Sequence, residues 1–130
     1  PSESNLYFWS KSGDVKELPA SQLRLLLDNS AARLVYLSCC EGATSGNSTA
    51  LFKGDYLGLA DAAVRAGVPS VLGYRWPIDE VNALNFALEF YQTLLNHGDP
   101  RVATWYARRM LAASAPTNLT WLSPILIHQI

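Results

Sequence analysis

Two short apolar runs flank a helical segment, and this pattern constrains the fold more than any other feature of the sequence. The runs are residues 34–38 (LVYLS) and 70–73 (SVLG); the helical segment is residues 57–66, and Gly67 is placed to end it. Two strands joined by one helix form a right-handed βαβ unit with parallel strands. We therefore predict an α/β fold with a mostly parallel sheet, in which the strand at 34–38 is buried on both faces.

Other elements are expected on both sides of this unit. Residues 6–10 (LYFWS) predict a strand because they are rich in aromatic side chains, and residues 12–14 predict a turn. Residues 19–21 (PAS) open a short helix, residues 41–56 form a loop with three glycines, and residues 121–130 are apolar and strand-like. The face of the short helix that we expect to be buried comprises Leu23, Leu26 and Leu27.

Two longer helices are predicted in the second half of the chain. Asp79 is placed to cap the first, and Asp99-Pro100 supplies a cap and a first turn for the second, which Pro116 closes. Apolar residues recur at steps of three and four in the first helix, which predicts a buried stripe. That stripe comprises Val81, Leu84, Leu88, Tyr91 and Leu95. The corresponding inward set of the second helix is Val102, Trp105, Tyr106, Met110 and Ala113.

Composition limits the function. The chain has 130 residues, 49% of them hydrophobic, and a net charge of −1. These values predict one domain with ample core and give no electrostatic reason for nucleic acid or a membrane as partner. The two cysteines are adjacent and are poorly placed to form a disulfide, so free thiols and a cytoplasmic setting are expected. The chain begins with Pro1 and its one methionine is Met110, so we expect a piece of a longer polypeptide.

The loop after the first buried run allows three interpretations. A phosphate-binding loop would need a lysine, but Asn47 stands where that lysine belongs. Two buried structural thiols are the plainest interpretation of Cys39 and Cys40. A nucleophilic cysteine would need a histidine base, and neither His97 nor His128 has a sequence context that indicates one.

The segment around the cysteines resembles the Leu-Ser-Ala-Cys motif of CHAT domains, which are caspase-like cysteine-protease domains often fused to TPR repeats. The resemblance covers residues 5–127 and continues in order along the chain. The motifs that carry it are Leu37-Ser38-Cys39-Cys40-Glu41-Gly42, Gly54-Asp55-x-x-Gly58-Leu59-Ala60, Ala66-Gly67-Val68-Pro69-Ser70-Val71, Trp76-Pro77-Ile78-Asp79 and Phe90-Tyr91-x-x-Leu94. It implies a caspase-like, three-layer α/β/α fold, of which residues 1–130 are the C-terminal, cysteine-bearing portion.

The resemblance also implies a mechanism. Cys40 takes the position of the nucleophile, and Cys39 takes that of the alanine before it. The family's catalytic histidine belongs to a His-Gly motif that would lie before Pro1. The implied function is a cysteine endopeptidase that needs no cofactor or metal and is nearly inactive as this isolated chain. The alternative is a catalytically incomplete caspase-like scaffold that acts through protein contacts.

Caspase-like enzymes bind substrate as an added strand beside the segment that follows the second core strand. That segment is residues 73–77 here, so Tyr74, Arg75 and Trp76 are candidate substrate-binding residues. Asp79 is a fourth candidate, because a carboxylate would suit a basic substrate side chain. Structural roles remain open for three of them: Trp76 as a core anchor, Arg75 paired with Asp79 or Glu80, and Asp79 as a helix cap.

The expected partners follow from the same resemblance. They are a protein or peptide substrate, the remainder of the polypeptide with its histidine, and a sensor or TPR-type domain. Bacterial defence systems are one setting in which such domains occur, and direct contact with nucleic acid or a membrane is not expected.

Overall fold

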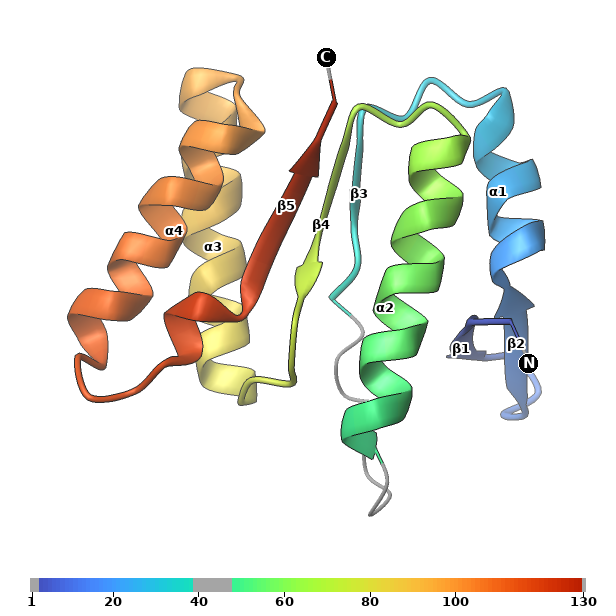
Figure 1. Cartoon of the computed structure of the whole chain (residues 1–130), viewed down its shortest axis with the longest axis horizontal. Helices are drawn as coiled ribbons and strands as arrows, with labels where there is room; N and C mark the ends of the chain where they lie inside the picture. Colours follow the sequence, from blue (N-terminus) through green and yellow to red (C-terminus); the bar gives the residue numbers. More distant parts are fainter. Residues whose placement is uncertain (1–2, 39–47, 130) are drawn as a thin grey trace.

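The computed structural model describes residues 3–38 and 48–129 of the chain (Figure 1). The elements in chain order are β1 (Asn5–Trp9), β2 (Val15–Pro19), α1 (Ala20–Asp28), β3 (Leu34–Tyr36), α2 (Ser48–Arg65), β4 (Ser70–Tyr74), α3 (Glu80–His97), α4 (Pro100–Ser114), the 3₁₀ turn η2 (Thr120–Leu122) and β5 (Pro124–His128). The α/β class predicted from the sequence is confirmed. The described side chains begin again at Leu57 within α2.

The central sheet has the order β3-β4-β5 and is mixed. β3 and β4 are parallel, with Leu34 opposite Ser70, as the βαβ prediction required. β4 and β5 are antiparallel, with Ser70 opposite His128, so this part of the sheet is not mostly parallel. The reason is that two antiparallel helices, α3 and α4, separate β4 from β5. A single helix after a strand returns the chain to the end of the sheet where that strand began, so the next strand is parallel. A second helix takes the chain back to the other end, so β5 starts where β4 stops and runs antiparallel to it.

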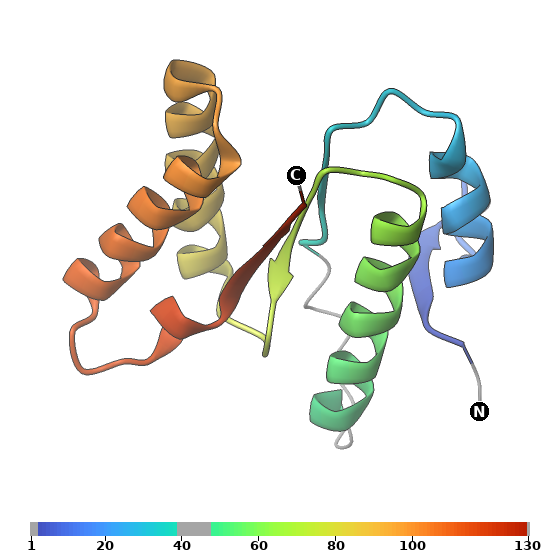
Figure 2. The ribbon, with the colours of Figure 1, turned by 45° about the horizontal axis from the view of Figure 1, so that its top comes forward.

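Helices cover both faces of this sheet (Figures 1 and 2). Strand residues that alternate in sequence point to opposite faces. One set packs against α3 and α4 and comprises Leu34, Tyr36, Leu72, Tyr74 and Leu126. The other packs toward α1 and α2 and comprises Val35, Val71, Ile125 and Ile127. β4 is buried along its whole length, because it is paired on both sides and covered on both faces.

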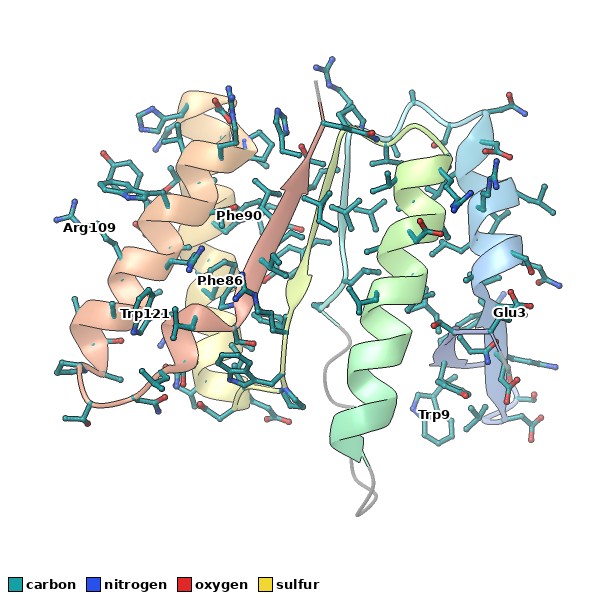
Figure 3. The ribbon with its side chains drawn as sticks, viewed as in Figure 1. Glu3, Trp9, Phe86, Phe90, Arg109 and Trp121 are labelled. Carbon is teal, nitrogen blue, oxygen red and sulfur yellow. The ribbon has the colours of Figure 1, made fainter. Side chains whose placement is uncertain are left out.

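An aromatic cluster joins α3 to the sheet. Phe86 and Phe90 are fully buried on the side of α3 that faces the strands (Figure 3). Tyr36 of β3 packs edge-on against Phe90, with 5.6 Å between the ring centroids. The hydroxyl groups of Tyr36 and Tyr74 are 2.7 Å apart and share a hydrogen bond, which satisfies two polar atoms in an apolar setting.

The predicted orientation of α3 is wrong. Four residues of the predicted stripe lie outward, with exposed fractions of 67% for Val81, 61% for Leu84, 60% for Leu88 and 86% for Leu95. The fifth, Tyr91, is 44% exposed, and its ring stacks on Tyr36 at the border of the core. The helix carries two apolar faces, and the sheet packs against the one with Phe86 and Phe90. Each buried phenylalanine removes more apolar surface from water than a leucine or valine does, which favours this orientation.

The predicted inward face of α4 is wrong for three of its five residues. Trp105, Tyr106 and Ala113 are exposed, whereas Val102 and Met110 are partly buried. The buried residues of α4 are Ala103, Thr104, Ala107 and Leu111. Small side chains on this face let α4 approach α3 and the sheet closely.

Several boundaries also differ from those predicted. α2 begins at Ser48, so residues 48–56 are helical rather than part of the loop, and residues 41–47 lie outside the described chain. β2 was not predicted; it forms an antiparallel hairpin with β1. In α1, Leu23 is buried but Leu26 is exposed. β3 is half-buried rather than fully buried, because it is the outer strand among those described.

The caps were predicted correctly. Asp79 accepts a hydrogen bond from the backbone N–H of Asn82 and begins α3. Pro100 is the first residue of α4, preceded by Asp99 as its cap. Gly67 follows α2 with a positive φ of 87°, which only glycine adopts without strain.

The two faces of α3 predict unequal effects of substitution. Phe90→Ala is expected to lower the free energy of unfolding by about 3–5 kcal/mol, because it leaves a cavity in a fully buried cluster. Leu95→Ala, on the outward face, is expected to change it by less than about 0.5 kcal/mol. Urea unfolding of the two variants provides the comparison. Equal losses would show that the face of α3 that carries Leu95 also packs in the core.

Candidate functional site

The candidate site lies at the edge of the sheet where β3 and β4 end. Both strands are parallel, so their carboxyl ends meet at this edge, the usual location of sites in α/β sheets. The pairing continues one residue past β3, because the backbone N–H of Leu37 donates to the carbonyl of Leu72 at 2.7 Å. Leu37 is itself buried in the core on the α1 and α2 side. Cys39 and Cys40 come two and three residues later and lie outside the described residues.

The segment after β4 is held by one buried serine. Ser123, immediately before β5, accepts from the backbone N–H of Arg75 through its carbonyl at 2.7 Å. Its hydroxyl accepts from the N–H of Trp76 at 3.1 Å and donates to the carbonyl of Trp76 at 2.5 Å. Ser123 is fully buried, so these bonds are shielded from water. Nothing in the sequence singled out Ser123, because its role depends on a contact across 47 positions.

These contacts change what the segment offers to a substrate. The backbone donors of Arg75 and Trp76 are both used by Ser123, so an added strand would have to displace it to pair there. Tyr74 is 1% exposed and its side chain lies in the aromatic cluster, which gives it a packing role. Trp76 is partly buried against the same core, in line with its role as an anchor. Arg75 is exposed, and it takes part in none of the ion pairs found among the described residues.

Asp79 uses its carboxylate within its own helix. It accepts from the backbone N–H of Asn82 at 3.1 Å and from the side-chain amide of Asn82 at 2.5 Å. These hydrogen bonds, the backbone one first, lower the pKa of Asp79 below its ordinary value of 3.8. The carboxylate is exposed and ionised at neutral pH, so capping leaves its charge available at the end of the sheet.

A second guanidinium group lies near Arg75. Arg108 of α4 donates from Nε to the carbonyl of Trp121 at 3.1 Å, and its guanidinium lies 5.8 Å from the centroid of the Trp121 ring. Burial lowers the pKa of Arg108, and the charge of Arg75 lowers it further. Two positive charges, those of Arg75 and Arg108, therefore lie close enough to interact at the segment after β4.

Both histidines of the chain lie at the opposite edge of the sheet. His128 ends β5 and pairs with Ser70, the first residue of β4, whose hydroxyl is 2.7 Å from Nδ1 of His128. His97 is the last residue of α3, the helix that runs back from the carboxyl end of β4. Its ring stacks on that of Tyr106, with 6.0 Å between the ring centroids. In Figure 1 the C-terminus lies beside the start of β4, away from the end of β3. The structure therefore brings neither histidine to the candidate site.

That opposite edge carries a hollow that sequence analysis did not predict. It has a volume of about 330 Å³ and is lined by Arg33, Leu34, Pro69, Ser70, Leu94, Gly98, Asp99, Pro100, Arg101 and His128. Asp99 and Arg101 pair within it at 2.9 Å, and this partner lowers the pKa of Asp99 to about 2.

Within residues 3–38 and 48–129, His, Cys, Asp and Glu side chains form no cluster of three that would hold a metal ion. No helix among these residues has the length and hydropathy needed to cross a bilayer.

The CHAT domain family matches residues 1–127, which is nearly the whole chain, so the chain belongs to the CHAT domain family. This family is associated with caspase-like cysteine peptidases. Comparisons with curated proteins and with solved structures found no match.

The geometry of Asp79 predicts a pH-dependent cap. Asp79→Ala is expected to lower the free energy of unfolding by about 1 kcal/mol at pH 7. The pKa is lowered in the folded state, so the carboxylate stabilises the fold above pH 3.8 and this contribution is lost as the pH falls through the folded pKa. Chemical unfolding of both proteins between pH 7 and pH 3 checks this. A difference that grows toward acid would contradict the assignment.

Proposed function

We propose that this chain is the cysteine-bearing part of a caspase-like cysteine endopeptidase, with Cys40 as the nucleophile. The three-layer α/β/α fold of that class is part of the proposal, and helices on both faces of the sheet support it. The observation that carries the proposal is the parallel β3–β4 pairing, which holds the chain in register up to Leu37. Because the chain belongs to the CHAT domain family, we assign Cys40, three residues after Leu37, to this end of the sheet.

The proposed reaction is hydrolysis of a peptide bond. The Cys40 thiolate attacks the carbonyl carbon, and the backbone N–H of Cys40 donates to the developing oxyanion. A histidine transfers a proton to the leaving amine, and water then hydrolyses the thioester to release the acid and regenerate the thiol. Because His97 and His128 both lie at the far edge of the sheet, we assign this histidine to polypeptide outside the chain.

The substrate is proposed to bind beside the segment after β4 through side chains. Arg75 is exposed there, Trp76 presents its partly buried ring, and Asp79 contributes a charge. Two guanidinium groups, those of Arg75 and Arg108, favour a neutral or acidic substrate side chain next to them over a basic one. Tyr74 is left out of this set, because its side chain is enclosed by the core.

The wider setting is part of the same proposal. The enzyme acts in the cytoplasm, where Cys39 and Cys40 remain free thiols. Other domains of the polypeptide, of a sensor or TPR type, control its activity, and bacterial defence is the process that we propose for it.

A catalytically incomplete scaffold is the second candidate function. Both histidines lie at the end of the sheet away from the carboxyl end of β3, which favours this function, because neither histidine then supplies the base that cysteine hydrolysis needs there. The scaffold would act through protein contacts and would not depend on either thiol.

The two functions differ in their response to cysteine substitution. In the full-length polypeptide, Cys40→Ala is expected to abolish cleavage of a protein substrate, with a loss of at least about 10³-fold, because it removes the nucleophile. Cys39→Ala is the matched control and should keep most of the activity. Cleavage is followed by gel or mass spectrometry. Loss of activity in the Cys39 variant alone would move the nucleophile by one residue, and activity that survives both substitutions would end the proposal.

Asp79 allows its two roles to be separated. Asparagine is as good a helix cap as aspartate, so Asp79→Asn is expected to leave the free energy of unfolding within about 0.5 kcal/mol of the parent. It removes the charge, so the rate of cleavage is expected to shift between substrates that differ only in the charge of the residue before the cut. Unchanged ratios for acidic, neutral and basic substrates would show that Asp79 is only a cap.

A further inference from the structure

The hollow at the far edge of the sheet lies where the ends of three strands meet the turn between α3 and α4, at the top of the molecule in Figure 1. Ser70 of β4 lies opposite Leu34 of β3 on one side and His128 of β5 on the other, so these three residues form one row across the sheet. Residues in register on neighbouring strands point to the same face, and Leu34 packs toward α3 and α4. The row therefore faces the two helices, and the turn at residues 98–100 lines the hollow from the other side.

The size of Ser70 explains why space remains at this end of the sheet. Further along β4, Leu72 and Tyr74 belong to the same buried cluster as Phe86 and Phe90 and fill the layer between sheet and helices. Ser70 points to the same face but has a much shorter side chain. The space that it leaves has a volume of about 330 Å³. Sites for small molecules have volumes of about 300–1,000 Å³, so the hollow is large enough for a small ligand.

A buried hydroxyl orients the histidine in the wall of the hollow. Ser70 is 1% exposed, and its hydroxyl lies 2.7 Å from Nδ1 of His128. When the hydroxyl donates to Nδ1, the other ring nitrogen, Nε2, carries the proton and can donate to a ligand. The charge of His128 also reaches Asp99, because it contributes to the lowered pKa of that carboxyl, after the larger effect of the hydrogen bonds from Arg101.

The charges that line the hollow leave it positive. Among the described residues, the lining carries one carboxylate, that of Asp99. Both of its oxygens accept from Arg101, one at 3.1 Å from Nε and the other at 2.9 Å from Nη2, so this pair is neutral as a unit. Arg33 lines the same hollow and takes part in none of the ion pairs found among residues 3–38 and 48–129. Arg33 and His128 are therefore left as donors from two different strand ends.

We propose that this hollow is a binding site for a small organic anion. Carboxylate or phosphate oxygens of the ligand accept hydrogen bonds from Arg33 and His128, and its apolar part lies against Leu34 and Leu94. Hydrogen bonds between charged groups are stronger than neutral ones, so an anion is favoured over a neutral ligand of the same shape. The hollow lies at the end of the sheet away from the carboxyl end of β3. The ligand is therefore distinct from the peptide substrate, and the site goes beyond the proposed function.

Calorimetric titration of the full-length polypeptide tests the preference for an anion. The probes are phenyl phosphate, benzoate and benzamide, which share one ring and carry a phosphate, a carboxylate and a neutral amide. At least one of the two anions is expected to bind about tenfold or more tightly than benzamide, because only an anion pairs with the guanidinium group of Arg33. The tighter of the two identifies the anionic group. Equal affinities for the three probes, or no binding of either anion, would overturn the proposal.

Three substitutions test whether the named donors hold the anion. Arg33→Gln and His128→Gln are each expected to weaken binding of the tighter anion by about tenfold, and glutamine at 128 still offers Ser70 a hydrogen-bonding partner. Arg24→Gln is the matched control, because this arginine is an exposed residue of α1 outside the lining of the hollow. It is expected to change the affinity by less than about twofold. Unchanged binding in the Arg33 or His128 variant, or an equal loss in the Arg24 variant, would contradict the proposal.

Photolabelling locates the bound anion. In the full-length polypeptide, 4-azidobenzoate is expected to attach to residues 94–101 or 126–129 on illumination, and an excess of the tighter anion should prevent this. Mass spectrometry of the digest identifies the labelled positions. Attachment only outside these residues and residues 33–34 would overturn the proposal. Cys40→Ala is expected to leave the labelling unchanged, so a failure of the peptidase proposal and a failure of this one are measured separately.

Discussion

The placement of the candidate site depends on β4. It is hydrogen-bonded to β3 on one side and β5 on the other, and all five of its residues are buried. Its parallel partner β3 precedes the segment that contains Cys40. The residues that follow β4, Arg75 and Trp76, are hydrogen-bonded to Ser123, which precedes the antiparallel strand β5. One strand therefore fixes both walls of the candidate site. Because a central strand cannot shift register without exposing a whole apolar face, the relative position of these walls is set by the core.

Much of this architecture follows from local sequence, and the failures have identifiable causes. The βαβ unit, the caps at Asp79 and Asp99, and the glycine stop at Gly67 depend on residues close in sequence, and all of these predictions were correct. The orientation of α3 was not predictable, because the helix has two apolar faces and periodicity cannot choose between them. The antiparallel direction of β5 depends on the two helices that separate it from β4 rather than on its own residues.

In the candidate site, too, the features that depend on nearby residues were predictable from the sequence, and those that depend on the fold were not. A motif places Cys40 after the first buried run, and the structure confirms the strand that precedes it. Ser123 was missed because a serine beside a proline carries no signal until the fold brings it to Trp76. The prediction that Tyr74 contacts substrate conflicts with the alternation of side chains along β4, which directs Tyr74 into the core. Leu72 and Tyr74 point to the same α3 face, which is already filled by aromatic rings.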